Sequence, residues 1–178
     1  KSGVYAENED TRPTGAWGRN RFMPTNFAFL DDGGFLLVDG YGAYCIHEYD
    51  KDGNWKRHFG GPGRGKGKFN LPHGIWIDRR PGRKPSIAVC DRANHTVQYL
   101  DMNGKHLETL TGYGLPANID TYKNLMLIPE LHARVTLLNE RNEVVAQLGD
   151  DVEGVVKKNS VNRGNPKTWV KGKFVHPH

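Results

Sequence analysis

A proline placed just ahead of a short apolar segment recurs along the chain, and this repeat constrains the fold more than any other feature. Pro24, Pro72 and Pro116 stand at intervals of 48 and 44 residues, and Pro177 follows 61 residues later. A period of roughly 40–50 residues is typical of a propeller or a solenoid array. Histidine follows Pro72 and Pro177 but neither of the other two prolines, so it recurs in alternate repeats.

The first two repeats each contain four short apolar segments separated by turn residues. The Asp-Asp-Gly-Gly run at residues 31–34 predicts a hairpin turn, because Asp and Gly tolerate the positive φ angles that tight turns need. The continuous apolar run at residues 35–38 is typical of a strand buried on both faces. The third repeat is degenerate, but it keeps strand patterns at residues 125–128, 135–138 and 144–148. With no clear helical stripe, the pattern predicts an all-β fold, a β-propeller of four-stranded antiparallel blades.

The repeats also predict the domain organisation. We expect a polar lead-in loop at residues 1–21 and a partial propeller over residues 22–178. Within it we expect blades at about 22–60, 69–112 and 115–149, a basic insertion at 150–173 and the start of a fourth blade at 174–178. Three blades alone would leave two free strand edges and an unclosed core. We therefore expect that a missing segment or another chain completes the ring.

Composition narrows the class of protein. Hydrophobic residues make up 37% of the chain and 22 residues are glycine, which is typical of a turn-rich globular protein and not of a disordered one. The net charge of +5 suits either a solvated surface or an anionic partner. No apolar run approaches the ~18 residues that a membrane-spanning helix needs, so we expect no membrane partner. Cys45 and Cys90 lie inside apolar strand patterns, which favours buried free thiols. The sequence also permits the alternative of a disulfide between them.

The motifs within the blades resemble those of a known family. They include Val-Asp-Gly-Tyr at residues 38–41, Phe-Gly at 59–60 and Val-Cys-Asp-Arg at 89–92. This pattern resembles the NHL repeats of six-bladed propellers. The stretch 24–100 is similar in particular to the peptidyl-α-hydroxyglycine α-amidating lyase branch, and the likeness continues more weakly through the third blade. The resemblance implies six blades when the ring is complete, and a secreted or periplasmic protein.

The same resemblance implies a set of site residues. In that family, histidines from alternate blades converge on one zinc ion near the central channel, and His73 and His178 match two of these ligands. The third would come from a blade before Pro24. The family's catalytic tyrosine lies in an Asp-Gly-Tyr turn, which Tyr41 matches, and a site arginine lies in an Asp-Arg turn, which Arg92 matches.

Other family features are not matched in this chain. The resemblance places the ligands of a structural calcium ion and a second arginine in parts that this sequence does not contain. The cysteine pairs of the family have no counterpart, because neither Cys45 nor Cys90 falls on their positions. The exact reaction therefore does not follow from the motifs alone.

The implied chemistry is a metal-assisted cleavage. Three imidazoles with an open fourth position form a catalytic zinc pattern. The substrate hydroxyl would bind the zinc, Tyr41 would take its proton, and Arg92 would hold the substrate carboxylate. Such an enzyme cleaves a peptidyl-α-hydroxyglycine to a peptide amide and glyoxylate. Each residue also has a structural alternative: His73 and His178 as packing residues, Tyr41 as a turn aromatic, and Arg92 as an ion-pair partner of a neighbouring aspartate.

The competing function is a non-catalytic propeller that binds a protein or small ligand on one face. RNA binding is a weaker alternative, because the basic residues fall in separate turns, for example at 56–57, 64–68 and 79–84, and charge runs are more often solvated. The remaining histidines show no alternation, and we expect four of them at the surface: His95, His106, His132 and His176.

Overall fold

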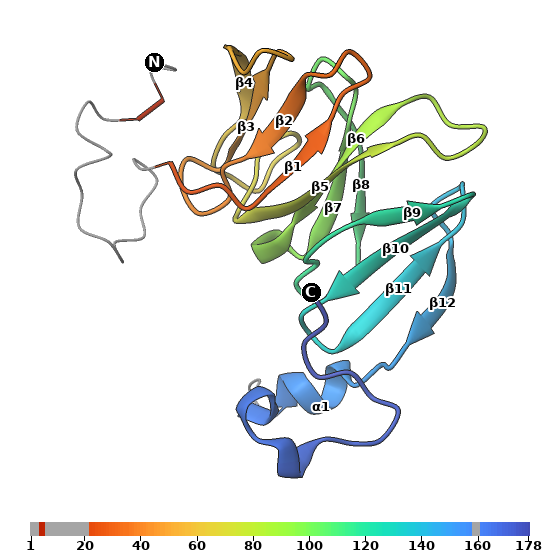
Figure 1. Ribbon diagram of the computed structural model, residues 1–178. Coiled ribbons are helices and arrows are strands. Elements are labelled where there is room, and N and C mark those ends of the chain that lie inside the picture. Colours follow the sequence, from red (N-terminus) through yellow and green to blue (C-terminus); the bar gives the residue numbers. More distant parts are fainter. Residues whose placement is uncertain (1–3, 6–21, 158–160) are drawn as a thin grey trace.

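The computed structural model describes residues 4–5, 22–157 and 161–178, and there the chain is built almost entirely from β-strands (Figure 1). Blade 1 consists of β1 (Asn26–Phe29), β2 (Phe35–Val38), β3 (Cys45–Tyr49) and β4 (Trp55–Gly60). Blade 2 consists of β5 (Pro72–Asp78), β6 (Ser86–Asp91), β7 (Thr96–Leu100) and β8 (His106–Thr111). Blade 3 consists of β9 (Asp120–Tyr122), β10 (Leu125–Glu130), β11 (Arg134–Leu138) and β12 (Val144–Leu148).

Each blade is an antiparallel sheet in which neighbouring strands follow one another along the chain. This arrangement confirms the predicted fold class, an all-β partial propeller with three four-stranded blades. The third blade begins with β9, a strand that the sequence did not predict, because its three residues, Asp-Thr-Tyr, contain no apolar run. The predicted lead-in loop, apart from residues 4–5, lies outside the described residues.

After the third blade the chain leaves the strand pattern. It forms the short helix α1 (Val152–Lys157) and two single-turn 3-10 helices, Val161–Gly164 and Pro166–Thr168. Residues 174–178 contain no strand. A further 3-10 turn, Arg92–Asn94, lies in the loop after β6. Among the described residues no helix has the length and apolar character needed to cross a membrane.

The segments that lead into the three blades lie against one another. Thr25 donates a hydrogen bond from its hydroxyl to the carbonyl of Pro72 at 3.1 Å, and the Asn26 amide donates to Asn118 Oδ1 at 2.8 Å. The backbones approach so closely that a Cβ atom on Gly74 would lie 2.5 Å from the Cα of Asn118. Glycine at this position therefore allows the inner strands of neighbouring blades to meet.

Blade 2 is buried on both faces, and β6 shows how this is done. Ile87 and Val89 point into an apolar cluster shared with blade 1, while Ala88 and Cys90 point into a second cluster shared with blade 3. Successive side chains of a strand point to opposite faces, so a strand packed on both sides must be apolar throughout. All six residues of β6 are buried accordingly.

The prediction that residues 35–38 are buried on both faces is wrong for β2. Leu36 and Val38 are buried in the cluster shared with blade 2, but Phe35 and Leu37 are only half-buried. The physical reason is that, within the described part of the chain, blade 1 packs against a neighbouring blade through one face only.

The outer faces of blades 1 and 3 carry exposed apolar side chains. On blade 1, Phe27 and Phe29 are 53% and 64% exposed, and on blade 3 Leu127 and Leu148 are 40% and 47% exposed. In blade 2 the corresponding surfaces are covered by the two neighbouring blades. These two faces are therefore the places where further blades could pack.

A buried arginine fastens blade 2 to blade 3. The fully buried side chain of Arg80 pairs with Asp78 at 2.8 Å. It also donates to the carbonyl of Asn139 at 2.5 Å and to Asn142 Oδ1 at 2.6 Å, both in the β11–β12 turn. Burial alone would raise the pKa of Asp78, but the hydrogen bonds and charge of Arg80, with the charge of Arg83, hold that pKa below its usual range.

Replacing Arg80 by alanine is expected to lower the free energy of unfolding by about 3–5 kcal/mol, because it removes the main partner of a buried carboxylate. Urea denaturation followed by circular dichroism measures this change. The matched control is Arg141→Ala, whose ion pair with Glu143 is exposed and should cost less than about 1 kcal/mol. Equal losses of unfolding free energy in the two variants would contradict the interpretation that Arg80 holds blades 2 and 3 together.

Candidate functional site

The structure brings the four predicted site residues together. Tyr41 lies in the loop after β2, Arg92 lies in the corresponding loop after β6, His73 lies in β5, and His178 ends the sequence. The Tyr41 hydroxyl is 3.3 Å from His73 Nε2 and 3.4 Å from Arg92 Nη1. Arg92 Nη2 is 3.1 Å from His178 Nε2. The centroids of the two imidazole rings are 4.8 Å apart, with an interplanar angle of 84°.

His73 is held as a neutral imidazole with one free lone pair. Its Nδ1 lies 3.0 Å from the carbonyl oxygen of Ala117, and a carbonyl can only accept, so Nδ1 carries the proton. The unprotonated Nε2 then faces the Tyr41 hydroxyl. Burial, the charge of Arg92 and the proximity of His178 together lower the pKa of His73 to about 4. At neutral pH this side chain is therefore in the form that binds a metal ion.

His178 presents its Nε2 in the same way. The atom facing it is a guanidinium nitrogen of Arg92, which can only donate, so Nε2 accepts and carries no proton. Partial burial, then the charges of Arg92 and Arg163, lower the pKa of His178. The residue is exposed on one side, while the ring faces His73 on the other.

Two backbone contacts hold the segment that carries His178. The amide of Phe174 donates to the carbonyl of Gly149 at 2.8 Å, and His176 Nδ1 donates to the carbonyl of Leu131 at 3.0 Å. The predicted surface position of His176 is wrong, because the side chain is half-buried against the β10–β11 loop. Its role could not be read from the sequence, since its partner is a backbone carbonyl 45 residues away.

The other three histidines predicted at the surface differ in their exposure. His95 is exposed as predicted, and the His106 side chain contacts Thr109 at the surface, whereas His132 is half-buried, so the prediction is wrong for His132. His132 lies beside His95 with ring centroids 5.8 Å apart, and a Cβ on Gly114 would meet its side chain at 2.6 Å. Its partial burial therefore comes from a packing contact between loops.

Arg92 is a buried cation without an acidic partner. Its residue is only 6% exposed, and in the described part of the chain it forms no ion pair. Among the described residues, its Nε finds no hydrogen-bond partner. The alternative that Arg92 pairs with Asp91 does not hold, because that carboxylate instead accepts from the Asn70 backbone, Asn94 and Gln98. Burying a charge without a counter-ion is costly, so this guanidinium is suited to an anionic ligand.

His73 and His178 fit two positions of a zinc site. Both Nε2 atoms are unprotonated, and the Ala117 carbonyl fixes the tautomer of His73 in the manner usual for metal-binding histidines. Among the described residues no third histidine, cysteine or carboxylate joins them in a metal-binding group.

A second cluster of possible metal ligands is joined by its own hydrogen bonds. Ligand atoms of Asp39, Cys45 and His47 lie within 4.8 Å of one another. The Trp55 indole donates to His47 Nδ1 at 3.1 Å, so Nε2 carries the proton and donates to the Tyr5 oxygen at 2.6 Å. Tyr5 in turn donates to Asp39 Oδ2 at 2.6 Å. Burial, followed by the charge of Asp39, raises the pKa of Cys45 to about 12, so its thiol is neutral at neutral pH in the metal-free protein.

The expectation of free cysteines is confirmed. Cys45 and Cys90 are both buried and unpaired. Cys90 points into the cluster between blades 2 and 3, where burial raises its pKa. Neither thiol is therefore a reactive nucleophile.

Comparison with solved structures places the fold among the propellers. No protein-family model matches the chain. A protein of unknown function from Bacteroides caccae matches with a TM-score of 0.51 and 21% identity over 70% of this chain and 45% of its own. A predicted exported protein from Bacteroides fragilis gives 0.56 and 15% over 68% and 36%. Streptogramin B lyase, a β-propeller, gives 0.55 and 15% over 70% and 39%.

These likenesses establish the fold and not the activity, because the identities are low. The chain spans less than half the length of each of the three structures. The structure and these comparisons therefore support the NHL and amidating-lyase resemblance only as far as a propeller of four-stranded blades.

Lowering the pH from 6.5 towards 4 is expected to destabilise the metal-free protein. The pKa of His73 falls from its ordinary 6.5 to about 4 on folding, so between these values the unfolded chain binds a proton that the folded chain does not. The free energy of unfolding should rise with pH in this window by at most ~1.4 kcal/mol per pH unit from this group. Denaturant titrations at several pH values should show a shallower slope for His73→Gln, and identical slopes would contradict the neutral, buried state.

Proposed function

We propose that the chain carries part of a metal-dependent lyase site of the amidating-lyase kind, acting on a peptide or small molecule with a carboxylate and an α-hydroxyl group. The observation that carries this proposal is the buried Arg92 guanidinium without a counter-ion, next to the Tyr41 hydroxyl and two unprotonated imidazole nitrogens. A substrate carboxylate would supply the missing negative charge and accept the guanidinium N–H groups. The site residues are thus chemically matched to both functional groups of an α-hydroxyglycine.

His73 and His178 are the residues that would hold a zinc ion, with a third ligand from outside the described residues. A zinc ion bound there would supply Lewis-acid polarisation of the substrate oxygen. The chain's own contribution is to keep both imidazoles neutral and to orient His73 through the Ala117 carbonyl. The resemblance also implies a structural calcium ion and places its ligands outside this chain. Its binding stays a prediction.

Tyr41 is the candidate base. Arg92 Nη1 donates to its oxygen, so the guanidinium would stabilise negative charge on that oxygen. In the proposed cleavage Tyr41 acts as a phenolate, which takes the proton of the substrate hydroxyl as the substrate C–O bond becomes the carbonyl of glyoxylate. The C–N bond breaks with its electron pair left on the amide nitrogen, and that nitrogen takes up the proton, which regenerates the phenolate. The reaction needs no oxidant or reductant.

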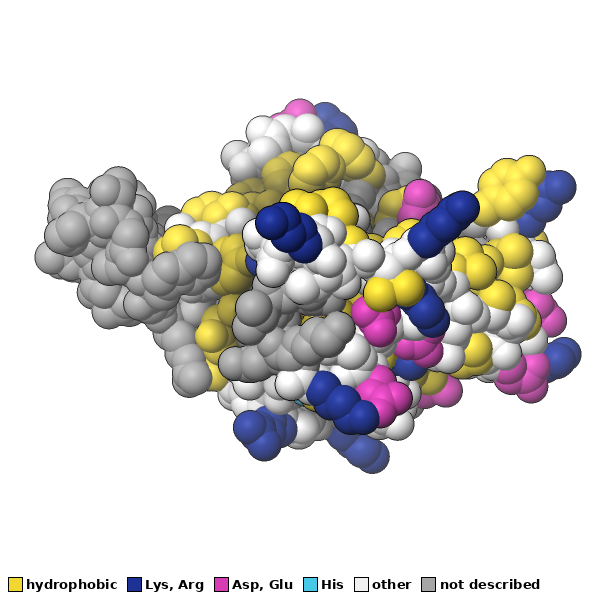
Figure 2. Space-filling view, turned by 90° about the horizontal axis from the view of Figure 1, so that it is seen from below, with side chains coloured by type: hydrophobic (Ala, Val, Ile, Leu, Met, Phe, Trp, Pro, Cys, Tyr) yellow, Lys and Arg dark blue, Asp and Glu magenta, His cyan; other side chains and the backbone are white. Residues whose placement is uncertain are grey.

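The charge on the face seen in Figure 2 does not favour nucleic acid as a partner. On the face seen in Figure 2, the coloured Lys and Arg side chains stand apart and alternate with Asp and Glu, so they form no continuous basic stripe. A binding protein for nucleic acid typically gathers its cations in one patch. A small-molecule or peptide substrate suits the site better.

We also propose that the complete protein is exported and that further blades cover the apolar outer faces of blades 1 and 3. Export rests on the likeness to the predicted exported protein of Bacteroides fragilis. The further blades, from the same protein or another chain, rest on the exposed Phe27, Phe29, Leu127 and Leu148.

Replacing His178 by alanine is expected to remove most of the zinc that the wild-type protein retains after dialysis. His178 is exposed on one side and lies outside the apolar clusters, so the fold should persist. Atomic absorption measures the metal, and His58→Ala, which changes an exposed histidine of β4, should keep it. Equal zinc content in wild type and His178→Ala would remove this histidine from the metal site.

Replacing Tyr41 by phenylalanine is expected to leave the zinc content unchanged and to lower kcat by ~10²–10⁴-fold, because it removes a proton acceptor and not a ligand. Glyoxylate release from an N-acyl-α-hydroxyglycine measures the rate. Tyr122→Phe, a change at an exposed tyrosine of blade 3, serves as the control. Wild-type protein that is loaded with zinc but releases no glyoxylate would refute the lyase proposal.

A further inference from the structure

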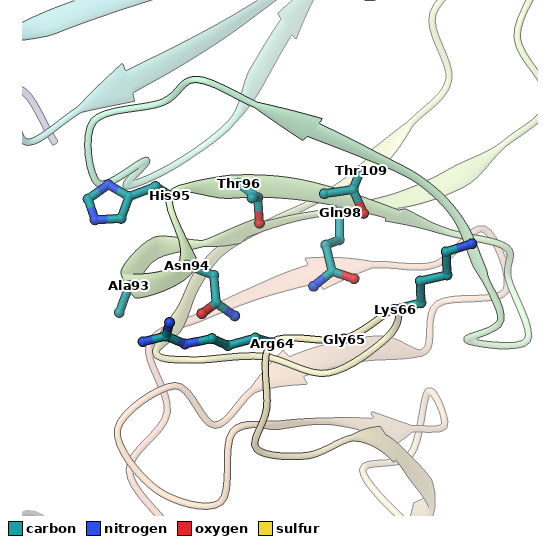
Figure 3. A pocket seen from close by; sticks show the side chains of 9 residues that line it. All are labelled: Arg64, Gly65, Lys66, Ala93, Asn94, His95, Thr96, Gln98 and Thr109. Carbon is teal, nitrogen blue, oxygen red and sulfur yellow. The ribbon is translucent and has the colours of Figure 1, made fainter.

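A second cavity lies between the loop that joins blades 1 and 2 and the outer strands of blade 2 (Figure 3). Its volume is about 510 Å³. The joining loop contributes Arg64 and Lys66, the loop after β6 contributes Asn94 and His95, and Thr109 comes from β8. None of these groups takes part in the site around His73.

The walls of this cavity are fixed by hydrogen bonds. Gln98 accepts from the backbone N–H of Gly67 at 2.9 Å and donates to the carbonyl of Lys68 at 2.7 Å. Asn94 donates to the carbonyl of Gly63 at 2.9 Å. These three bonds fasten the joining loop to blade 2 at both of its ends. The loop therefore presents its cations from a constrained backbone.

The cavity is electropositive at both ends. Figure 3 shows Arg64 and His95 at one end, and Lys66 at the other with Thr109 nearby. Within the described part of the chain, Arg64 and Lys66 form no ion pair, and no Asp or Glu lines the cavity. The buried carboxylate of Asp91 lies behind the floor, where it accepts from Asn94 Nδ2 at 2.7 Å and from Gln98 Nε2 at 2.9 Å, and the two loop cations outnumber it.

The space between the cations is polar. Asn94, Thr96 and Gln98 lie there, and Asn94 Oδ1 has no hydrogen-bond partner in the described structure. This oxygen and Thr96 Oγ1 are both buried beneath the cavity surface, so the floor is polar but closed. No aromatic side chain other than the His95 imidazole lines the cavity, so it lacks the stacking platforms that single-stranded nucleic acids use.

We propose that this cavity binds an elongated small molecule with negative charge at both ends, such as a sugar bisphosphate or a sugar dicarboxylate. One anionic group pairs with Arg64, and the other pairs with Lys66. This site stands on observations independent of the lyase proposal.

Isothermal titration calorimetry on the full chain tests the charge requirement. Fructose 1,6-bisphosphate should bind, fructose 6-phosphate should bind about tenfold more weakly because one charged contact is lost, and fructose should give no heat. Galactarate, a sugar dicarboxylate, tells whether carboxylates replace phosphates. If neither doubly charged probe binds at millimolar concentration, or if fructose binds as well as they do, the proposal is overturned.

Two charge-removing variants locate the site. Arg64→Gln and Lys66→Gln should each weaken binding of the preferred probe about tenfold, and the double variant should abolish it. The control variants Lys51→Gln and Arg141→Gln remove exposed cations elsewhere and should leave the affinity unchanged. Unchanged affinity in the Arg64/Lys66 double variant would refute this cavity as the binding site.

The His178→Ala variant separates this proposal from the lyase proposal. It should lose zinc but keep wild-type affinity for the preferred probe, since His178 does not line the cavity. Loss of probe binding in this variant would indicate that the probe binds at the site around His73. It would refute binding in the cavity beside Arg64. Circular dichroism of every variant verifies that the fold is retained.

Discussion

The position of the loop after the second strand of each blade depends on a buried carboxylate at the end of that strand. The carboxylate accepts a backbone N–H from the segment that leads into its own blade: Asp39 from Met23, Asp91 from Asn70 and Glu130 from Gly114, at 2.6, 2.7 and 2.5 Å. A buried carboxylate without such partners would be expensive, so the two segments are tied together. The loops that carry Tyr41 and Arg92 begin at two of these carboxylates, and the tie therefore sets where both side chains lie.

Two buried arginines, Arg80 and Arg92, and the half-buried Arg134 show how the same residue type serves two purposes. Arg80 pairs with Asp78 and Arg134 pairs with Glu130, and both join parts of the fold. Arg92 is buried like Arg80 but contacts a tyrosine hydroxyl and a histidine nitrogen in place of a carboxylate. A fold optimised only for stability would supply a counter-ion there. The exception marks the centre of the candidate site, in keeping with the tendency of functional sites to sacrifice stability.

Blade 2 shows what a blade requires when it has a neighbour on each side. Its central strand is apolar at successive positions because alternate side chains enter different clusters. Blades 1 and 3 have the same construction but bury one face each against blade 2, which leaves aromatic and aliphatic side chains exposed. Since the loss of apolar burial is costly at about 25 cal/mol per Å², these faces are the natural contact surfaces for additional blades.

The sequence by itself determined the blades and the residue types of the site. Strand positions followed from local alternation and Asp-Gly turns, which are decided within a few residues, and the Asp-Gly-Tyr, Asp-Arg and Pro-His motifs marked Tyr41, Arg92 and His73. Only the tertiary structure decided which groups meet: the missing partner of Arg92, the tautomers of His47 and His73, the burial of His176 and the electropositive cavity beside Arg64. Each depends on how one blade is rotated against the next, and this rotation arises from contacts between residues far apart in the chain, which no local pattern encodes.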